Sequence, residues 1–294
     1  MNAVEINHLT KFYGKSRGIT DLSLNIQEGD FFGFIGPNGA GKSTTIRTLL
    51  GLIAPTDGNA LIFGKDIRKN HKEQLTDIGY MPSEADFYTN MKVRDIIKYS
   101  AELRKRDCAA KAAALCDRLE LDTNKKISEL SLGNRKKVSI VCALQHEPKL
   151  CILDEPTSGL DPIIQREFFA ILTEINNQGA TIFLSSHILS EIQKYCRHAA
   201  IIRAGKLLLC ERIENLTHTN AKNVTISGVS TPPDLNNIRN VKIDGDTVSF
   251  IYSGEPNILM RALTQMPLTD VNISEPDLEE IIMHYYKEKN DDNS

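Results

Sequence analysis

A glycine-rich loop directly behind a short apolar run constrains the fold more than any other feature. The run Phe31–Ile35 leads into Gly36–Ser43, which has the spacing Gly-x-x-x-x-Gly-Lys-Ser, and Ser43–Leu52 follows as an expected helix. In such a strand-loop-helix unit, the loop amides and the positive end of the helix dipole hold phosphate groups. A glycine-rich turn without a ligand is the alternative, but the lysine and serine that end the loop favour a nucleotide.

The loop supplies two side chains with specific expected roles. Lys42 should reach the terminal phosphates, and Ser43 should ligate Mg²⁺. The predicted phosphate-binding residues are Gly36, Pro37, Asn38, Gly39, Ala40, Gly41, Lys42, Ser43 and Thr44.

The apolar runs around the loop predict an α/β fold with a parallel sheet. Further strands are expected at Leu150–Leu153, Thr181–Ser185 and Ala199–Arg203, and a helix is expected over Ile163–Asn176. Buried strands that alternate with helices are typical of a parallel sheet covered on both faces.

Two other regions have different patterns. Apolar residues recur at helical spacing from Val93, and the alanine-rich run Ala109–Leu121 continues the pattern, so a helical insert is expected over about residues 88–148. Short alternating strands follow residue 217, around an Asp244-Gly245 turn. We therefore expect a first domain over 1–216 and a small C-terminal α+β domain over 217–294, which would close with a helix over Pro276–Tyr286.

An acidic pair and a histidine follow two of the expected strands. Asp154 and Glu155 come directly after four apolar residues, at the sheet edge where α/β folds place ligands. Asp154 is suited to Mg²⁺ binding, and Glu155 could accept a proton from an attacking water. His187 stands at the same edge and could contact the terminal phosphate. Alone, the acids could begin an ordinary loop, and the histidine could be a solvated loop residue.

In this order, the motifs resemble the nucleotide-binding domain of ATP-binding cassette (ABC) proteins over about residues 3–216. The resemblance implies a P-loop NTPase core with a parallel sheet, an N-terminal antiparallel β part and a helical insert. It also implies ATP and Mg²⁺ as cofactors and catalytic roles for Glu155 and His187. Tyr13 would stack on adenine, with Phe12 as a neighbouring candidate and core packing as the alternative for either ring.

The segment Leu130–Asn134 resembles the family signature Leu-Ser-Gly-Gly-Gln, from which Leu132 and Asn134 depart. Ser131, Gly133 and Asn134 would begin a helix and form a second anion site. In the family, the signature of one subunit closes over ATP bound to another subunit. The resemblance therefore implies a head-to-tail dimer of nucleotide-binding subunits.

Two further loops match the family, one of them with a departure. Asp161 ends the loop that crosses the dimer interface in the family, and it could also cap the following helix. Ser83 stands where the family has a glutamine that senses Mg²⁺ and couples to the membrane subunit. Glu84 could ligate through water, so we expect a coupling loop at Ser83 and Glu84 with altered chemistry. We interpret Arg135–Lys137 and the histidines other than His187 as solvated surface.

Composition narrows the range of partners and locations. A net charge of −3 over 294 residues, without a basic tract, predicts no nucleic-acid partner. The six cysteines form no Cys-x-x-Cys pair, which favours a reducing compartment over disulfides or metal ligation. No run approaches the roughly 18 apolar residues that span a bilayer. We expect a cytoplasmic chain that binds the inner face of the cell membrane through separate permease subunits.

The implied function is that of an ATP-binding and ATP-hydrolysing subunit of an ABC transporter. Glu275–Ile282 resembles a C-terminal segment of bacterial drug, antibiotic and polysaccharide or lipid exporters, which favours export; an amphipathic core helix is the alternative. A soluble ABC ATPase acting on nucleic acid or the ribosome is disfavoured by the single cassette and the lack of coiled coils. A low-turnover nucleotide-gated regulator is disfavoured by Lys42, Glu155 and His187.

Overall fold

The computed structural model describes residues 1–14, 16–69, 75–217 and 221–275. The chain divides into two compact units, the first over Met1–Cys210 and the second beginning at Glu211. From the sequence, the domain boundary is expected after residue 216.

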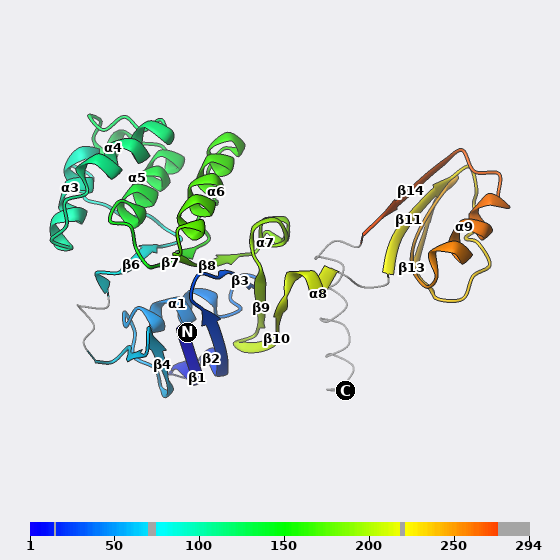
Figure 1. Ribbon diagram of the computed structural model, residues 1–294, viewed down its shortest axis with the longest axis horizontal. Helices are drawn as coiled ribbons and strands as arrows, with labels where there is room; N and C mark the ends of the chain where they lie inside the picture. The colour runs from blue at the N-terminus through cyan, green and yellow to red at the C-terminus, as the bar shows by residue number, and fades with distance from the viewer. Residues whose placement is uncertain (15, 70–74, 218–220, 276–294) are drawn as a thin grey trace. The chain divides into compact units, whose positions relative to one another are not determined.

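A six-stranded sheet forms the middle of the first unit, in the order β10-β9-β3-β8-β7-β6 (Figure 1). The neighbours from β9 to β6 pair in parallel, which confirms the parallel core predicted from the apolar runs. The strands are β3 (Phe31–Ile35), β6 (Ile78–Met81), β7 (Leu150–Asp154), β8 (Thr181–Ser186), β9 (His198–Arg203) and β10 (Lys206–Arg212).

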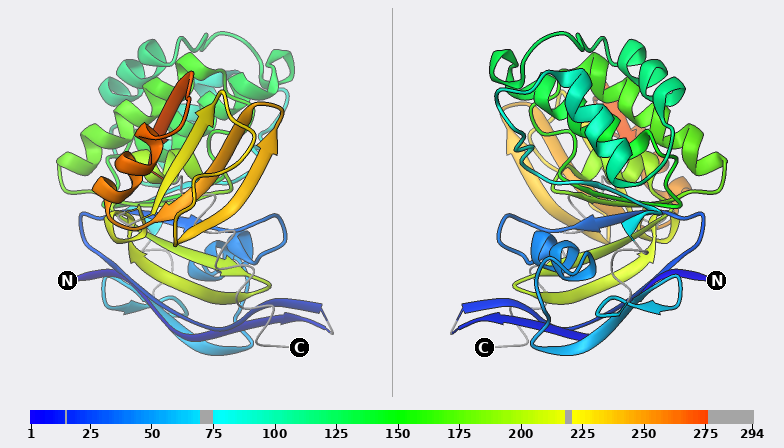
Figure 2. Two further views of the ribbon diagram at one scale, coloured as in Figure 1. Left: turned by 90° about the vertical axis from the view of Figure 1, so that its right-hand side faces the viewer. Right: turned by 90° about the vertical axis from the view of Figure 1, so that its left-hand side faces the viewer.

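Helices cover both faces of this sheet, so its central strands are buried along their whole length. One face packs against α1, and α5, α6 and α7 lie over the other (Figures 1 and 2). The helices are α1 (Lys42–Leu49), α5 (Leu132–Leu144), α6 (Pro162–Asn177) and α7 (Leu189–Tyr195). Within the described ranges, no helix is both long enough and apolar enough to traverse a bilayer.

A second, antiparallel sheet lies beyond α1, in the order β2-β1-β4-β5. Its strands are β1 (Asn2–Tyr13), β2 (Ser16–Gln27), β4 (Asp57–Ile62) and β5 (Lys65–Asp66). Ile6 and Leu24 of this sheet share one buried core with Ile46 of α1 and Phe34 of β3. The N-terminal antiparallel part therefore packs against the phosphate-loop helix, as the family resemblance implies.

The helical insert consists of α3 (Val93–Leu103), α4 (Ala109–Arg118), the 3₁₀ turn η1 (Ile127–Glu129) and α5. Val93, Ile96 and Ile97 are buried, which confirms the helical spacing of these apolar residues. Helix α5 packs against α3, α4 and β6. It therefore joins the insert to the parallel sheet.

The second unit contains the last two residues of β10, the helix α8 (Ile213–Thr217) and an antiparallel sheet in the order β12-β13-β11-β14. Its remaining elements are β11 (Ala221–Ser227), β12 (Ile238–Asp244), β13 (Thr247–Ser253), α9 (Pro256–Thr264) and β14 (Asp270–Ser274). Leu259 and Leu263 of α9 pack on Val224, Ile226 and Phe250 of the sheet. The helix expected over Pro276–Tyr286, and with it most of the exporter-like segment, lies outside the described residues.

Candidate functional site

The glycine-rich loop leaves β3 at Ile35 and enters α1 at Lys42, so it lies at the carboxyl edge of the parallel sheet. Its backbone requires glycine at two positions. Gly41 has φ of 111°, and a Cβ on Gly36 would lie 2.5 Å from Ile202 O. The first N–H groups of a helix have no acceptor inside it, and phosphate oxygens can take that place. The observed loop therefore has the backbone of an anion site.

The Lys42 side chain turns back across this loop and is only 6% exposed. Its Nζ donates to Gly36 O at 2.6 Å and to Pro37 O at 3.3 Å. It also lies 3.1 Å from Glu155 Oε1, in an ion pair whose angles are not those of a hydrogen bond. One ammonium thus connects the phosphate loop to the end of β7.

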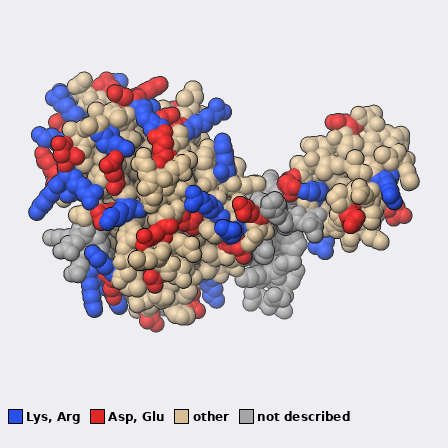
Figure 3. All heavy atoms as spheres, in the orientation of Figure 1, with Lys and Arg blue, Asp and Glu red and all other residues tan. Residues whose placement is uncertain are grey.

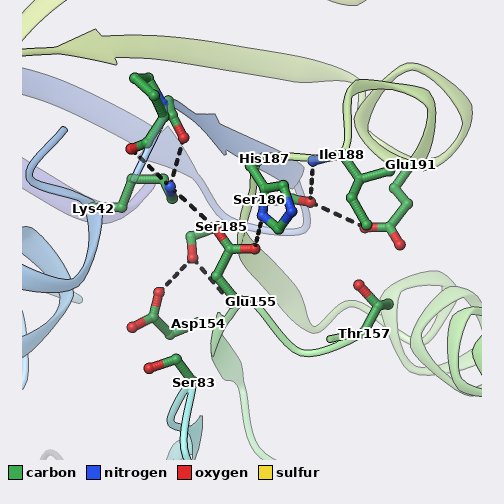
Figure 4. Close-up of polar contacts among 12 residues, drawn as sticks. Lys42, Ser83, Asp154, Glu155, Thr157, Ser185, Ser186, His187, Ile188 and Glu191 are labelled. Carbon is green, nitrogen blue, oxygen red and sulfur yellow. Dashed lines mark hydrogen bonds and ion pairs between the residues drawn. The ribbon is translucent and has the colours of Figure 1, made fainter. Parts of the chain in front are cut away.

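Glu155 follows β7 directly and has a left-handed backbone, with φ of 49°. Figure 4 shows its carboxylate between Lys42 and His187. Glu155 Oε2 lies 2.6 Å from His187 Nδ1, and the His187 side chain is 52% exposed. The structure therefore brings together the loop lysine, the second acid and the histidine, which come from three separate segments of the sequence.

Asp154, the last residue of β7, is 1% exposed and faces a different neighbour. Its Oδ1 accepts a 2.6 Å hydrogen bond from Ser185 Oγ, whereas Oδ2 is buried and has no hydrogen-bond donor among the described residues. Mg²⁺ prefers oxygen ligands and usually binds one or two carboxylates together with water and phosphate oxygens. The orphaned carboxylate oxygen and the half-buried Ser43 hydroxyl at the start of α1 fit that donor set.

Ser185 belongs to this cluster, although no motif in the sequence marks it. Besides donating to Asp154, its Oγ accepts from Glu155 N at 3.2 Å, and its carbonyl lies 3.2 Å from the same N–H. Ser185 therefore positions both acids. Two serines that follow three apolar residues and immediately precede His187 are the sequence signal that could have identified it.

The second of these serines, Ser186, holds the chain around His187. Its Oγ donates to Glu191 Oε2 at 3.1 Å and accepts from Ile188 N at 2.9 Å. Burial raises the pKa of Glu191, and hydrogen bonds from Thr157 and Ser186 oppose that rise. These contacts fix the start of α7 directly behind the histidine (Figure 4).

The interpretation of Lys136, Lys137 and His146 as solvated surface is wrong, because these side chains are 1%, 8% and 3% exposed. All three lie on or just after α5, which packs between the insert and the sheet. Lys136 Nζ donates to Ser83 O at 2.6 Å and to Glu155 O at 3.2 Å.

Burial shifts two of these groups toward their neutral forms. Desolvation lowers the pKa of Lys136, opposed by the charges of Asp154, Glu155 and Glu84. Burial likewise lowers the pKa of His146 from 6.5 to about 4.

The signature residues lie at the start of α5. Ser131 caps the helix, with its Oγ accepting from Asn134 N at 3.3 Å. A Cβ on Gly133 would lie 2.8 Å from Gly159 O, and the Leu132 side chain is 58% exposed. Within the described residues, no hydrogen bond or ion pair joins the signature to the phosphate loop.

Asp161 and Tyr13 lie in the first unit outside this cluster. Asp161 caps α6, because its Oδ1 accepts from Ile163 N at 3.1 Å and from Ile164 N at 3.0 Å. The Tyr13 ring is 46% exposed at the end of β1, and Phe12 beside it is 41% exposed. Neither ring is buried in the core.

The segment after Ser83 and Glu84 borders a cavity of about 450 Å³. The cavity is lined mainly by apolar and aromatic side chains from this segment and from α3. Tyr88, Tyr99 and Leu103 are 69%, 45% and 64% exposed there. The expected coupling loop thus lies beside an open apolar groove.

Comparisons with known proteins agree with this geometry. Residues 19–158 match the model of the ABC transporter family. The bacitracin transport ATP-binding protein BcrA of Bacillus licheniformis is 40% identical over 223 residues, covering 74% of this chain and 72% of the relative.

Solved structures show the same fold. The ATP-binding subunit of an ABC transporter matches with a TM-score of 0.69 and 28% identity, over 73% of this chain and 91% of the other. A dimeric ATP-binding cassette bound to ADP and phosphate matches with a TM-score of 0.63 and 24% identity, over 71% of this chain and 98% of the other. The chain belongs to the ABC transporter family, as one of its ATP-binding subunits.

Proposed function

We propose that this chain hydrolyses Mg·ATP to drive export through separate membrane subunits. One observation carries the proposal: the Glu155 carboxylate lies 3.1 Å from Lys42 Nζ and 2.6 Å from His187 Nδ1, beside the phosphate loop. A carboxylate held at that place can orient an attacking water and accept its proton.

Each side chain has a separate task in this proposal. The loop amides and Lys42 bind the terminal phosphates, which compete with Glu155 for the ammonium and free the carboxylate to accept a proton. His187 orients Glu155 and contacts the γ-phosphate. Ser43 and Asp154 would hold Mg²⁺, which neutralises charge on the phosphate oxygens when it is bound.

The adenine site and the second subunit complete the proposed arrangement. Tyr13, partly exposed, is suited to stack on adenine. Ser131, Gly133 and Asn134 would close over ATP held by a second nucleotide-binding subunit, in a head-to-tail dimer. The dimeric form of one solved cassette supports this arrangement.

The loop that ends at Asp161 would cross the dimer interface. We assign residues 1–216 to the nucleotide-binding domain, and 217–294 to an accessory domain that supports or regulates the dimer.

The apolar groove beside Ser83 and Glu84 suits a helix of a permease subunit. Tyr88, Tyr99 and Leu103 expose apolar surface there, and large exposed apolar patches are typical of interfaces. A permease docked in the groove would contact the coupling loop and hold the chain at the inner face of the membrane. The relative named for bacitracin transport supports a role in transport. Export as the direction rests on the exporter-like segment Glu275–Ile282.

A nucleic-acid partner gains no support from the one face that Figure 3 shows. On the face drawn in Figure 3, lysine and arginine are interspersed with aspartate and glutamate, without a continuous basic tract. Counterion release, which drives binding to nucleic acids, requires clustered basic charge.

The central test is Glu155→Gln in the purified chain. We expect kcat to fall by about 10² to 10⁴, the usual contribution of a positioned base, while ATP binding persists. Glu147→Gln is the matched control, because that carboxylate is 69% exposed and pairs only with Lys111 among the described residues. Undiminished phosphate release by Glu155→Gln would remove Glu155 from its role. Absence of any ATPase activity in the unaltered protein, alone and with its permease, would refute the proposed function.

A further inference from the structure

Lys136 is a deeply buried charged side chain near Asp154 and Glu155. It lies on the second turn of α5 and is 1% exposed. Burying an ammonium is unfavourable unless hydrogen bonds and opposite charge compensate. Its contacts therefore indicate what it does.

The ammonium of Lys136 bridges the ends of two neighbouring strands. Its Nζ donates to Ser83 O, just after β6, at 2.6 Å, and to Glu155 O, just after β7, at 3.2 Å. Strands β6 and β7 pair in parallel, so both carbonyls leave the sheet at the same edge. One side chain thus connects the coupling loop to the catalytic acid through their backbones.

These contacts hold a backbone conformation that is unfavourable for glutamate. Glu155 has φ of 49°, a region that residues with a Cβ rarely adopt. Ser185 accepts from its N–H, and Lys136 donates to its carbonyl, with Ser158 N as a second donor at 3.4 Å. The direction of the Glu155 carboxylate therefore depends on the contact to its N–H and on the contacts to its carbonyl.

Lys136 also belongs to the helix that begins at the signature. Ser131 caps α5, and Lys136 lies five residues later, about 7.5 Å along the axis at 1.5 Å per residue. A helix of this length moves as one body over such a distance. Lys136 therefore connects the helix that begins at the signature with the backbones of the coupling loop and Glu155.

We propose that Lys136 is a positioning residue, which sets the direction of the Glu155 carboxylate and links it to the coupling loop and the signature helix. This inference rests on the proposed function. It predicts that loss of the ammonium impairs hydrolysis through Glu155, without impairing nucleotide binding.

The test compares Lys136→Met with Lys137→Met in the full-length protein. Methionine keeps most of the apolar stem and removes the donors. Lys137 is the adjacent lysine, 8% exposed and without a hydrogen bond or ion pair among the described residues. We expect Lys136→Met to lower kcat by about 10- to 100-fold, the usual effect of misplacing a catalytic group by about 1 Å, with ATP affinity within about twofold. Lys137→Met should leave both quantities near those of the unaltered protein.

A double-variant cycle separates positioning from general structural support. In the Glu155→Gln background, single-turnover hydrolysis should fall by less than about threefold on adding Lys136→Met, because the group that Lys136 positions is already gone. Lys136→Gln, which keeps N–H donors, should retain more activity than Lys136→Met, and it replaces that variant in the cycle if Lys136→Met does not fold.

Three results would overturn the inference: an unchanged kcat, an equal fold loss in both backgrounds, or a parallel loss of ATP affinity. An inactive unaltered protein would instead contradict the proposed function itself.

Discussion

Ser185→Ala should weaken Mg²⁺-dependent hydrolysis, because one hydroxyl positions both acids of the site. Ser185 Oγ donates to Asp154 Oδ1 at 2.6 Å and accepts from Glu155 N at 3.2 Å. Asp154 Oδ2 already has no hydrogen-bond donor among the described residues. Alanine would therefore leave both carboxylate oxygens without the contact that fixes their plane, whereas Glu155 N keeps the Ser185 carbonyl as an acceptor.

The expected size follows from the contact that is lost. A hydrogen bond to a charged group contributes about 1.5–3 kcal/mol. Because each 1.4 kcal/mol corresponds to a factor of ten, that range predicts a loss of about 10- to 150-fold. Removing a partner that orients a metal ligand usually lowers metal affinity or activity by about 10- to 100-fold.

The assay is phosphate release at saturating ATP, titrated with MgCl₂. The half-saturating Mg²⁺ concentration should rise by about 10- to 100-fold in Ser185→Ala. Thr181→Val is the matched control, since it removes a buried hydroxyl at the other end of β8 that accepts from Gly29 N at 3.0 Å. It should lower stability without changing the Mg²⁺ dependence. A half-saturating concentration within about twofold of the unaltered protein would refute this reasoning about Asp154.

Three other predictions concern binding, dimerisation and pH. Lys42→Ala should weaken ATP binding by about 10- to 100-fold, the contribution of charge-assisted hydrogen bonds, in titrations with a fluorescent ATP analogue. Gly133→Ala would place a Cβ 2.8 Å from Gly159 O, so it should reduce ATP-dependent dimerisation by about 5- to 100-fold in light scattering while monomer binding persists. Below pH 6.5, His146 takes up a proton in the unfolded chain but not in the folded one until about pH 4, so stability should fall by about 3 kcal/mol between these values. Urea melts of His146→Gln should lack this fall, whereas His8→Gln, altered at an exposed histidine, should retain it.

Lys42, Asp154, Glu155 and His187 could be predicted from the sequence because each is marked locally. A glycine spacing or the end of an apolar strand identifies them, and parallel strands bring their carboxyl ends to one edge. The clustering of Glu155 with Lys42 and His187 follows from topology that the alternation of strands and helices already implied.

Lys136, Ser185 and His146 could not be identified in this way. Their surroundings are set by α5 packing against the sheet and by the pairing of β7 with β8, which are contacts between distant segments. A lysine between two other basic residues is typical of a solvated surface, and tertiary packing overrode that pattern. The serines were visible in the sequence, but only the paired strands place Ser185 opposite Asp154.

The acidic pair shows why these unmarked residues matter. Asp154 still has extended strand geometry and faces Ser185, whereas Glu155 turns into the left-handed region and faces Lys42 and His187. One step along the chain thus separates a buried carboxylate suited to bind Mg²⁺ from a carboxylate suited to act as a base. The left-handed turn costs about 1–2 kcal/mol for a residue with a Cβ. Hydrogen bonds from Lys136 and to Ser185 oppose that cost, so loss of either neighbour should weaken the hold on the turn that directs the Glu155 carboxylate.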